Sequence, residues 1–294
     1  MQSQFHFLLG EERNSLWLPV KIMKIILSRK GLDSSAGGKP SPILKNGKIF
    51  SIPIPSNDEN SPHRYNDVVI NAINAADMLS LVGAKKLNSF DTCHFDPLLK
   101  YDIGLFGQAG NAQRELDNLG VGEGDLFLFF GWFRDFQQSK KADYHHIFGW
   151  LQVDEVIKGT NQIRKFCKMS GIKHPHACAD ETRYKNNTLF ISHPGSKLKF
   201  SDSNVRAHGL FVKTNNKLIL TEPGRTRSNW YMPTKYFSPS SNPELFETRL
   251  RWSSKNSNRI KCSGYGQEFV IDTEKNPSVK DWARDLFLSN NVVC

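Results

Sequence analysis

The chain has 294 residues, 38% of them hydrophobic, which is enough for the core of one large domain or two small ones. No apolar run approaches the roughly 18 residues of a membrane-spanning helix, so we expect no membrane span. The formal net charge is +10, and residues 197–261 hold thirteen Lys and Arg against four Asp and Glu, so one region carries nearly the whole excess. Such a region favours a polyanionic partner, nucleic acid first, although a solvated basic face is the alternative.

The first half of the chain predicts a strand, a hairpin and two helices. Lys24–Ser28 is apolar and β-branched, which is typical of a buried strand. Asn46 and Gly47 separate two short apolar runs and predict a hairpin turn, and the prolines Pro53 and Pro55 place the second run at a sheet edge. Two helices are predicted next, over residues 66–83 and 108–120.

The second half predicts mainly strands. The apolar run Leu126–Phe130 indicates a fully buried strand, and HHIFGWLQVDEVI at residues 145–157 predicts a second long strand beside it. Short strands are expected at residues 187–192, 209–213, 217–221 and 268–271, with a hairpin turn at residues 215–216 and a closing helix from Ser278. Together the elements predict an α+β fold with a mixed, mostly antiparallel, curved or barrel-like sheet and a few flanking helices.

The cysteine count and a second methionine bear on compartment and domain limits. Five cysteines without a CxxC pair favour neither a disulfide framework nor a thiolate zinc site, and they are typical of a reducing, cytoplasmic setting. Met23 directly precedes the first convincing strand. We therefore expect an N-terminal extension over residues 1–22 and a single domain over residues 23–294.

A long polar loop follows the first strand. It begins with Arg29 and Lys30 and continues through Asp33, Ser34 and Ser35. The two cations can bind a phosphate or a carboxylate, and Asp33 can act as a base or orient a sugar hydroxyl. Binding sites collect at strand ends, but an ordinary surface loop with Ser and Asp turns is an equal alternative.

Histidines form a second candidate group. His94 lies two residues before Asp96, a spacing that suits an acid–base pair or two metal ligands. A metal would need a third ligand, which the HPH segment at residues 174–176 can supply. Because the intervening proline forces an extended backbone, we favour packing or capping histidines here and assign no metal.

Three further segments offer substrate contacts. Gln108 lies at a predicted helix start, where free amides attract anions, unless it only caps the helix. Arg227 and Trp230 lie in the basic region and suit phosphate contact and base stacking, unless Trp230 is a core residue. Gln267 and Glu268 lie at the start of a predicted strand. The Gln side chain can read a base edge, and the Glu carboxylate can accept a hydrogen bond from an exocyclic amine or act as a general base. The alternative is an ordinary solvated start of a strand.

The order of these segments has a family likeness. Along the chain the stretches are KIILSRKGLDSSAGGKPSPI, FGQAGNAQRELDNLGVGEGDLFLFFGWFR, HHIFGWLQVDEVI, HPH, LTEPGRTRSNWYMP and GYGQEFVI. This series resembles the nucleotide modification associated domain, type 3, from about Met23 to Leu288, with Leu32 as a departure where the family usually has Phe. The family is associated with DNA base hypermodification in phages and bacteria. The resemblance implies a role in base modification, and it implies neither a particular reaction nor a cofactor.

A weaker likeness covers two strands. GEGDLFLFFG and IFGWLQVDEVI are similar to the central strands of PUA-like domains of the ASCH and EVE types, which cradle a base. This resemblance implies a PUA-like core as one possible form of the sheet.

Two functions of different classes follow, with a third behind them. The first is an enzyme that binds a nucleobase of DNA or a nucleotide at strand ends and modifies or processes it. Its catalytic candidates are Asp33, His94, Asp96 and Glu268. Its substrate-binding candidates are Arg29, Lys30, Ser34, Ser35, Gln108, Arg227, Trp230 and Gln267. The second is a non-catalytic, PUA-like reader of modified bases. The third is a metal-dependent nuclease or hydrolase acting on modified DNA, with the metal at His94, Asp96 and His176.

Overall fold

The computed structural model describes residues 21–100, 102–136, 142–182, 184–201, 204–240, 244–247, 250–254, 257–262, 267–288 and 292–293. The expected N-terminal extension lies almost wholly outside these residues. In the described part of the chain, no helix has the length and hydrophobicity that crossing a bilayer requires.

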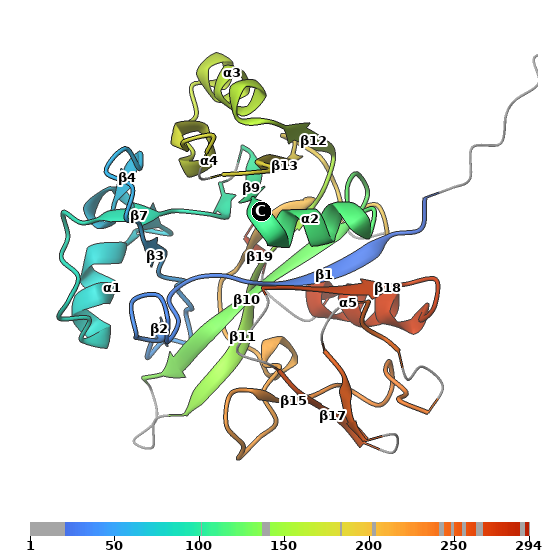
Figure 1. Cartoon of the computed structure of the whole chain (residues 1–294). Coiled ribbons are helices and arrows are strands. Elements are labelled where there is room, and N and C mark those ends of the chain that lie inside the picture. The colour runs from blue at the N-terminus through green and yellow to red at the C-terminus, as the bar shows by residue number, and fades with distance from the viewer. Residues whose placement is uncertain are drawn as a thin grey trace, which may run out of the picture.

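A mixed sheet of seven described strands forms the centre of the molecule (Figure 1). Its order is β18-β1-β10-β11-β14-β19, and β2 pairs with the far end of β10. The strands are β1 (Lys24–Arg29), β2 (Ser41–Ile43), β10 (Leu126–Asp135), β11 (Asp143–Gln152), β14 (His208–Phe211), β18 (Glu268–Asp272) and β19 (Val292–Val293). The predicted neighbours β10 and β11 are an antiparallel pair, which confirms that prediction, whereas β1 runs parallel to β10.

A second, antiparallel sheet has the order β12-β13-β9-β8. Its strands are β8 (Leu98–Leu99), β9 (Gly104–Gln108), β12 (Glu155–Lys158) and β13 (Thr188–Ser192). The prediction of one strand over residues 145–157 was wrong, because the chain leaves the central sheet after Gln152. The amide N–H of Asp154 donates to the Ile191 carbonyl at 2.8 Å, which transfers the chain to the second sheet.

Three small sheets and the helices complete the fold. The small sheets join β3 (Ile54–Pro55), β7 (Thr92–His94) and β4 (His63–Arg64); β5 (Val69–Ile70) and β6 (Ile73–Asn74); and β15 (Asn229–Tyr231), β17 (Ser257–Lys261) and β16 (Trp252–Ser254). The α-helices are α1 (Ala75–Val82), α2 (Gly110–Asn118), α3 (Thr160–Ser170), α4 (Pro175–Cys178) and α5 (Ser278–Leu288), and short 3₁₀ turns occur at Tyr65–Asp67 and Asn216–Leu218. Sequence patterns predicted α2 and α5 and missed α3 and α4.

Two local predictions were wrong for reasons of turn chemistry. The first helix begins at Ala75 rather than after Asn66, because Asn71 and Ala72 take positive φ values of 50° and 63° and turn the chain into the β5–β6 hairpin. The strand expected at residues 217–221 is replaced by a 3₁₀ turn, because the Asn215 side chain accepts from the Lys217 amide and caps it.

The central sheet is covered on both faces, because alternate residues of its strands point to opposite sides. Ile25 and Leu27 of β1 pack in one cluster with Trp282 of α5, whereas Ile26 packs in another with Phe106 of β9. The second sheet therefore covers one face and the C-terminal part of the chain covers the other. The result is an α+β fold with mostly antiparallel strands, as predicted, but among the described strands the central sheet is open and forms no closed barrel.

Candidate functional site

Several strands end at one cleft of about 490 Å³. Its polar lining includes Arg29 at the end of β1, Lys30, Asp33 and Ser35 of the following loop, His94 of β7, Asp96, Gln108 of β9, His176 and Tyr184, and Gln267 beside β18. These segments are far apart in sequence. They meet because the second sheet packs on the central sheet, which brings the end of β9 close to the end of β1.

The loop after β1 has a fixed shape. Oδ1 of Asp33 accepts hydrogen bonds from the Ser35 amide at 2.7 Å, the Ser35 hydroxyl at 2.7 Å and the Ala36 amide at 2.8 Å. Gly37 has a positive φ of 87°, and a Cβ there would lie 2.4 Å from Leu32 Cδ2. Small residues and an Asx turn thus fold this loop back onto itself, and Asp33 shapes the cleft wall as well as lining it.

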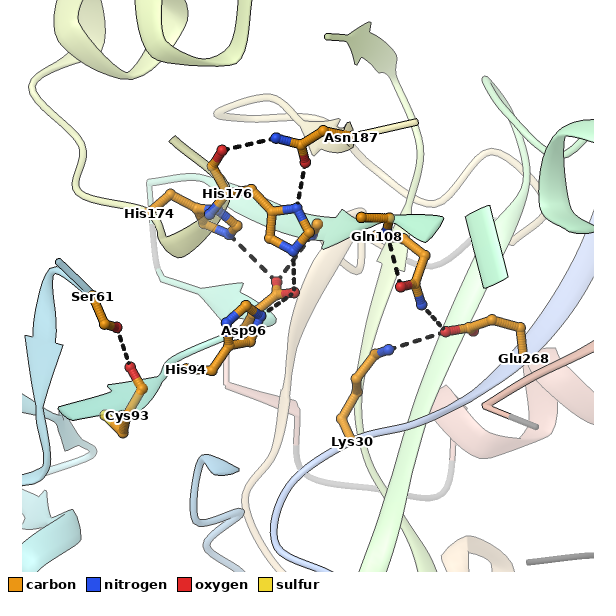
Figure 2. A network of polar contacts seen from close by, with 12 residues as sticks. Lys30, Ser61, Cys93, His94, Asp96, Gln108, His174, His176, Asn187 and Glu268 are labelled. Atoms are coloured by element: carbon orange, nitrogen blue, oxygen red, sulfur yellow. Dashed lines mark hydrogen bonds and ion pairs between the residues drawn. The ribbon is translucent and has the colours of Figure 1, made fainter. Parts of the chain in front are cut away.

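A buried carboxylate connects the two sheets behind the cleft (Figure 2). Oε1 of Glu268 accepts from Lys30 Nζ at 3.0 Å and from Gln108 Nε2 at 2.6 Å. The Glu268 side chain is fully buried, and its Oε2 has no hydrogen-bond partner among the described residues. Lys30 Nζ also lies 4.5 Å from the ring centroid of Phe106. Glu268 therefore orients two residues that line the cleft, and it does not line the cleft itself.

Three histidines surround the buried carboxylate of Asp96 (Figure 2). Asp96 Oδ2 lies 3.6 Å from His94 Nε2 and 3.7 Å from His176 Nε2, and Oδ1 lies 3.4 Å from His174 Nε2. Oδ1 also accepts from the Gly107 amide at 3.0 Å. Four polar groups from β7, β9, α4 and the segments beside them thus meet at one end of the cleft.

Burial governs the ionisation of this group. Burial alone would raise the pKa of Asp96, but the facing imidazoles of His174, His94 and His176 hold it below its ordinary value. Burial lowers the pKa of His176 to about 3, against partial compensation from Asp96. An ionised carboxylate therefore faces a neutral imidazole at neutral pH.

Arg227 and Ser34 lie outside this cleft but are linked to it. The Arg227 guanidinium lies 4.0 Å from a ring centroid of Trp132 and donates to Ser34 Oγ at 3.1 Å. Arg227 lines a separate hollow of about 940 Å³, together with Arg225 and Tyr231. A hydrogen bond thus joins the loop after β1, which lines the cleft, to a residue that lines the second hollow.

Trp230 does not reach either hollow. Its side chain is fully buried, and its indole N–H donates to His145 Nδ1 at 2.8 Å. Trp230 is therefore a core residue, which was the alternative interpretation of the sequence, because a ring without exposed surface cannot stack on a base. The exposed aromatic ring of this strand belongs to its neighbour Tyr231, which is 41% exposed.

Four residues of the site were not among the predicted set. His174 and His176 come from the HPH segment, which the sequence placed only in the metal-dependent alternative. Gly107 allows close packing, because a Cβ at this position would lie 2.2 Å from His176 Cδ2. Asn187 is the fourth, and a buried Asn has no sequence signal that separates it from the many surface ones.

Comparisons with known proteins give one match. The family model of nucleotide modification associated domain 3 matches residues 24–272, which include every residue that lines the cleft. A search of curated proteins and a search of solved structures each find no significant match. The match spans most of the chain and agrees with the resemblance of the sequence motifs, so this protein belongs to the nucleotide modification associated domain 3 family.

Proposed function

We propose that this protein acts in nucleotide or DNA modification by binding a nucleobase in the cleft between β1, β9 and β7 and processing it there. The observation that carries the proposal is the convergence of the polar groups in one cleft of a family with this association. Its volume of about 490 Å³ lies within the range of small-molecule sites.

The chemistry of the lining suits a base. Gln267 presents an exposed amide group, which can pair with the edge of a base in two-point fashion. Gln108 lines the cleft with its amide held by Glu268 and by the Ala109 N–H. Asp33 supplies a carboxylate, and His94 with Asp96 supplies groups that can exchange protons. Glu268 acts indirectly in this proposal, by holding Lys30 and Gln108 in position.

The neighbouring hollow suits the rest of a polymer. It is lined by Lys217, Arg225, Arg227 and the exposed ring of Tyr231, and it belongs to the basic region of the chain. Cations with an interleaved aromatic ring are typical of single-strand nucleic-acid contacts. DNA is therefore the partner we favour over a free nucleotide, with Tyr231 in the stacking role that the sequence suggested for Trp230.

Binding to labelled single-stranded DNA, measured by fluorescence anisotropy over a range of salt concentrations, tests the partner. Contacts from the basic hollow predict that affinity falls steeply with salt, by roughly 0.7 log units per log unit of salt for each phosphate contact. Arg225→Ala should reduce that slope. A slope near zero, with tight binding of free nucleotides, would assign the cleft to nucleotides alone.

Two variants test the cleft. Gln267→Ala should weaken binding of the base without lowering stability, because Gln267 is exposed, whereas Gln162→Ala on the exposed face of α3 is the matched control. Equal affinity of the two variants would remove the cleft from the proposal. Asp33→Asn distinguishes an enzyme from a non-catalytic reader. If this variant still binds modified DNA but no longer turns it over, catalysis is supported. If the wild type binds modified bases and turns none of them over, a reader is supported.

A further inference from the structure

We propose that His94, Asp96 and His176 bind one divalent transition-metal ion, through His94 Nε2, Asp96 Oδ2 and His176 Nε2. The proposal that a metal binds here rests on the geometry of the three side chains, whereas a role of that metal as a Lewis acid in the wall of the cleft rests on the proposed function. Among the described residues these three form one group whose ligand atoms all lie within 4.8 Å of one another.

The spacing of the ligand atoms is close to that of a metal site. Bonds of about 2.05 Å in a tetrahedral arrangement place neighbouring ligand atoms roughly 3.3 Å apart. Asp96 Oδ2 lies 3.6 Å from His94 Nε2 and 3.7 Å from His176 Nε2, which a shift of a few tenths of an ångström would close. These separations are too long for direct hydrogen bonds, so the three atoms leave a gap between them.

The hydrogen bonds of Asn187 determine which His176 nitrogen faces this gap. Asn187 Nδ2 donates to Thr160 Oγ1 and to the His176 carbonyl, both at 3.0 Å, so the amide orientation is set and its Oδ1 is an acceptor. That oxygen lies 2.6 Å from His176 Nδ1, which must therefore carry the ring proton. The other nitrogen, Nε2, then presents a lone pair to Asp96 Oδ2. Two acceptors that face each other repel, and a metal cation between them would remove this repulsion; a buried partner that fixes the opposite nitrogen is typical of metal-bound histidine.

The two oxygens of Asp96 are divided in the same way. Oδ1 accepts from the Gly107 amide and faces His174 Nε2 at 3.4 Å. His174 Nδ1 accepts from the His176 amide, so a neutral His174 ring carries its proton on Nε2, a buried atom for which the described part of the chain offers no other hydrogen-bond partner. Oδ1 is thus oriented by donors from the protein, and Oδ2 is left to face His94 and His176.

The site would be open on one side. All three residues line the cleft, so a metal held by them has its remaining coordination positions toward the cleft. Two imidazoles and one carboxylate with open positions are the ligand set of catalytic zinc and of non-haem iron(II) sites. The sequence favoured packing or capping histidines because the proline of the HPH segment forces an extended backbone, whereas in the structure His174 and His176 both face Asp96.

The first test measures metal content and affinity. The protein is purified without chelator and analysed by inductively coupled plasma mass spectrometry; a portion is stripped with EDTA, titrated with Co²⁺ and then displaced with Zn²⁺. We expect about one metal per chain and a visible Co²⁺ spectrum that Zn²⁺ removes. Asp96→Asn and His176→Gln should abolish both, whereas His193→Gln, at a half-buried histidine that pairs with Glu155 at 2.9 Å, should change neither.

A second variant guards against loss of folding in the first two. Asn187→Ala leaves the ligands in place and should weaken Zn²⁺ binding by roughly 10- to 100-fold. Zn²⁺ should also raise the melting temperature of the wild type and of His193→Gln. Substoichiometric metal in the wild type, or metal retained by folded Asp96→Asn, would overturn the proposal. Because these readouts contain no nucleotide, they fail or succeed independently of base binding, which is measured separately on the stripped protein.

Discussion

Gly107 offers a direct perturbation of the histidine cluster, because it lies in β9 against the ring of His176. A Cβ at Gly107 would lie 2.2 Å from His176 Cδ2 and 2.6 Å from its Nε2, whereas ordinary contacts begin at 3.4 Å. Gly107→Ala therefore requires the ring to move by about 1.2 Å, the difference between 3.4 and 2.2 Å. Metal sites tolerate departures of only about 0.2 Å in their bond lengths.

A matched control lies in the same strand. A Cβ at Gly104 would lie 2.6 Å from Cβ and Cγ of His208, which is outside the cleft. Both substitutions overpack a buried histidine, so each should lower the free energy of unfolding by roughly 1–3 kcal/mol. Only Gly107→Ala should displace His176 from Asp96.

The assay combines urea unfolding with a Co²⁺ titration of each variant. We expect comparable losses of stability, loss of the Co²⁺ spectrum in Gly107→Ala and retention of it in Gly104→Ala. If both variants keep the spectrum, or both lose it while folded, the assignment of Gly107 to the close packing of His176 is wrong.

Three further predictions concern the buried polar groups. Glu268→Gln leaves Lys30 without its carboxylate and should lower the free energy of unfolding, measured with urea, by roughly 3–5 kcal/mol. The double variant Lys30→Met/Glu268→Gln should lose less stability than the two single variants together. Additive losses would contradict the pairing of Lys30 with Glu268. Trp230→Phe removes the hydrogen bond to His145 and should lower stability by about 1–2 kcal/mol with unchanged DNA affinity; weaker DNA binding at equal stability would return Trp230 to the interface. Burial lowers the pKa of His145 to about 3 and of His146 to about 4. Below about pH 6.5 the unfolded state therefore binds more protons than the folded state, and the free energy of unfolding should fall from pH 7.5 to pH 5 by about 2 kcal/mol per histidine. The fall should be shallower in His146→Gln. An unchanged dependence of stability on pH in this variant would exclude a contribution from His146.

Local patterns in the sequence were sufficient for elements stabilised by their own residues. The apolar run Leu126–Phe130 and the long strand predicted from residue 145 onward were expected to be neighbours, and they form the antiparallel centre of the sheet. Burial on both faces demands apolar runs of this kind. The polar loop after β1 was recognised from its glycines and its Asp33 turn. The family followed from the order of such motifs, which does not depend on the tertiary fold.

The tertiary structure decided which of these motifs meet. It placed Asp33, His94, Gln108 and Gln267 in one cleft, moved Arg227 to the neighbouring hollow and buried Trp230 in the core. Hydrophobic packing between the two sheets sets these positions, and it depends on side chains that are far apart in sequence, such as Ile26, Phe106 and Val270. A sequence pattern shows the chemistry of each side chain. Only the packing of the layers determines where a side chain points and which hydrogen-bond partner sets the position of its proton.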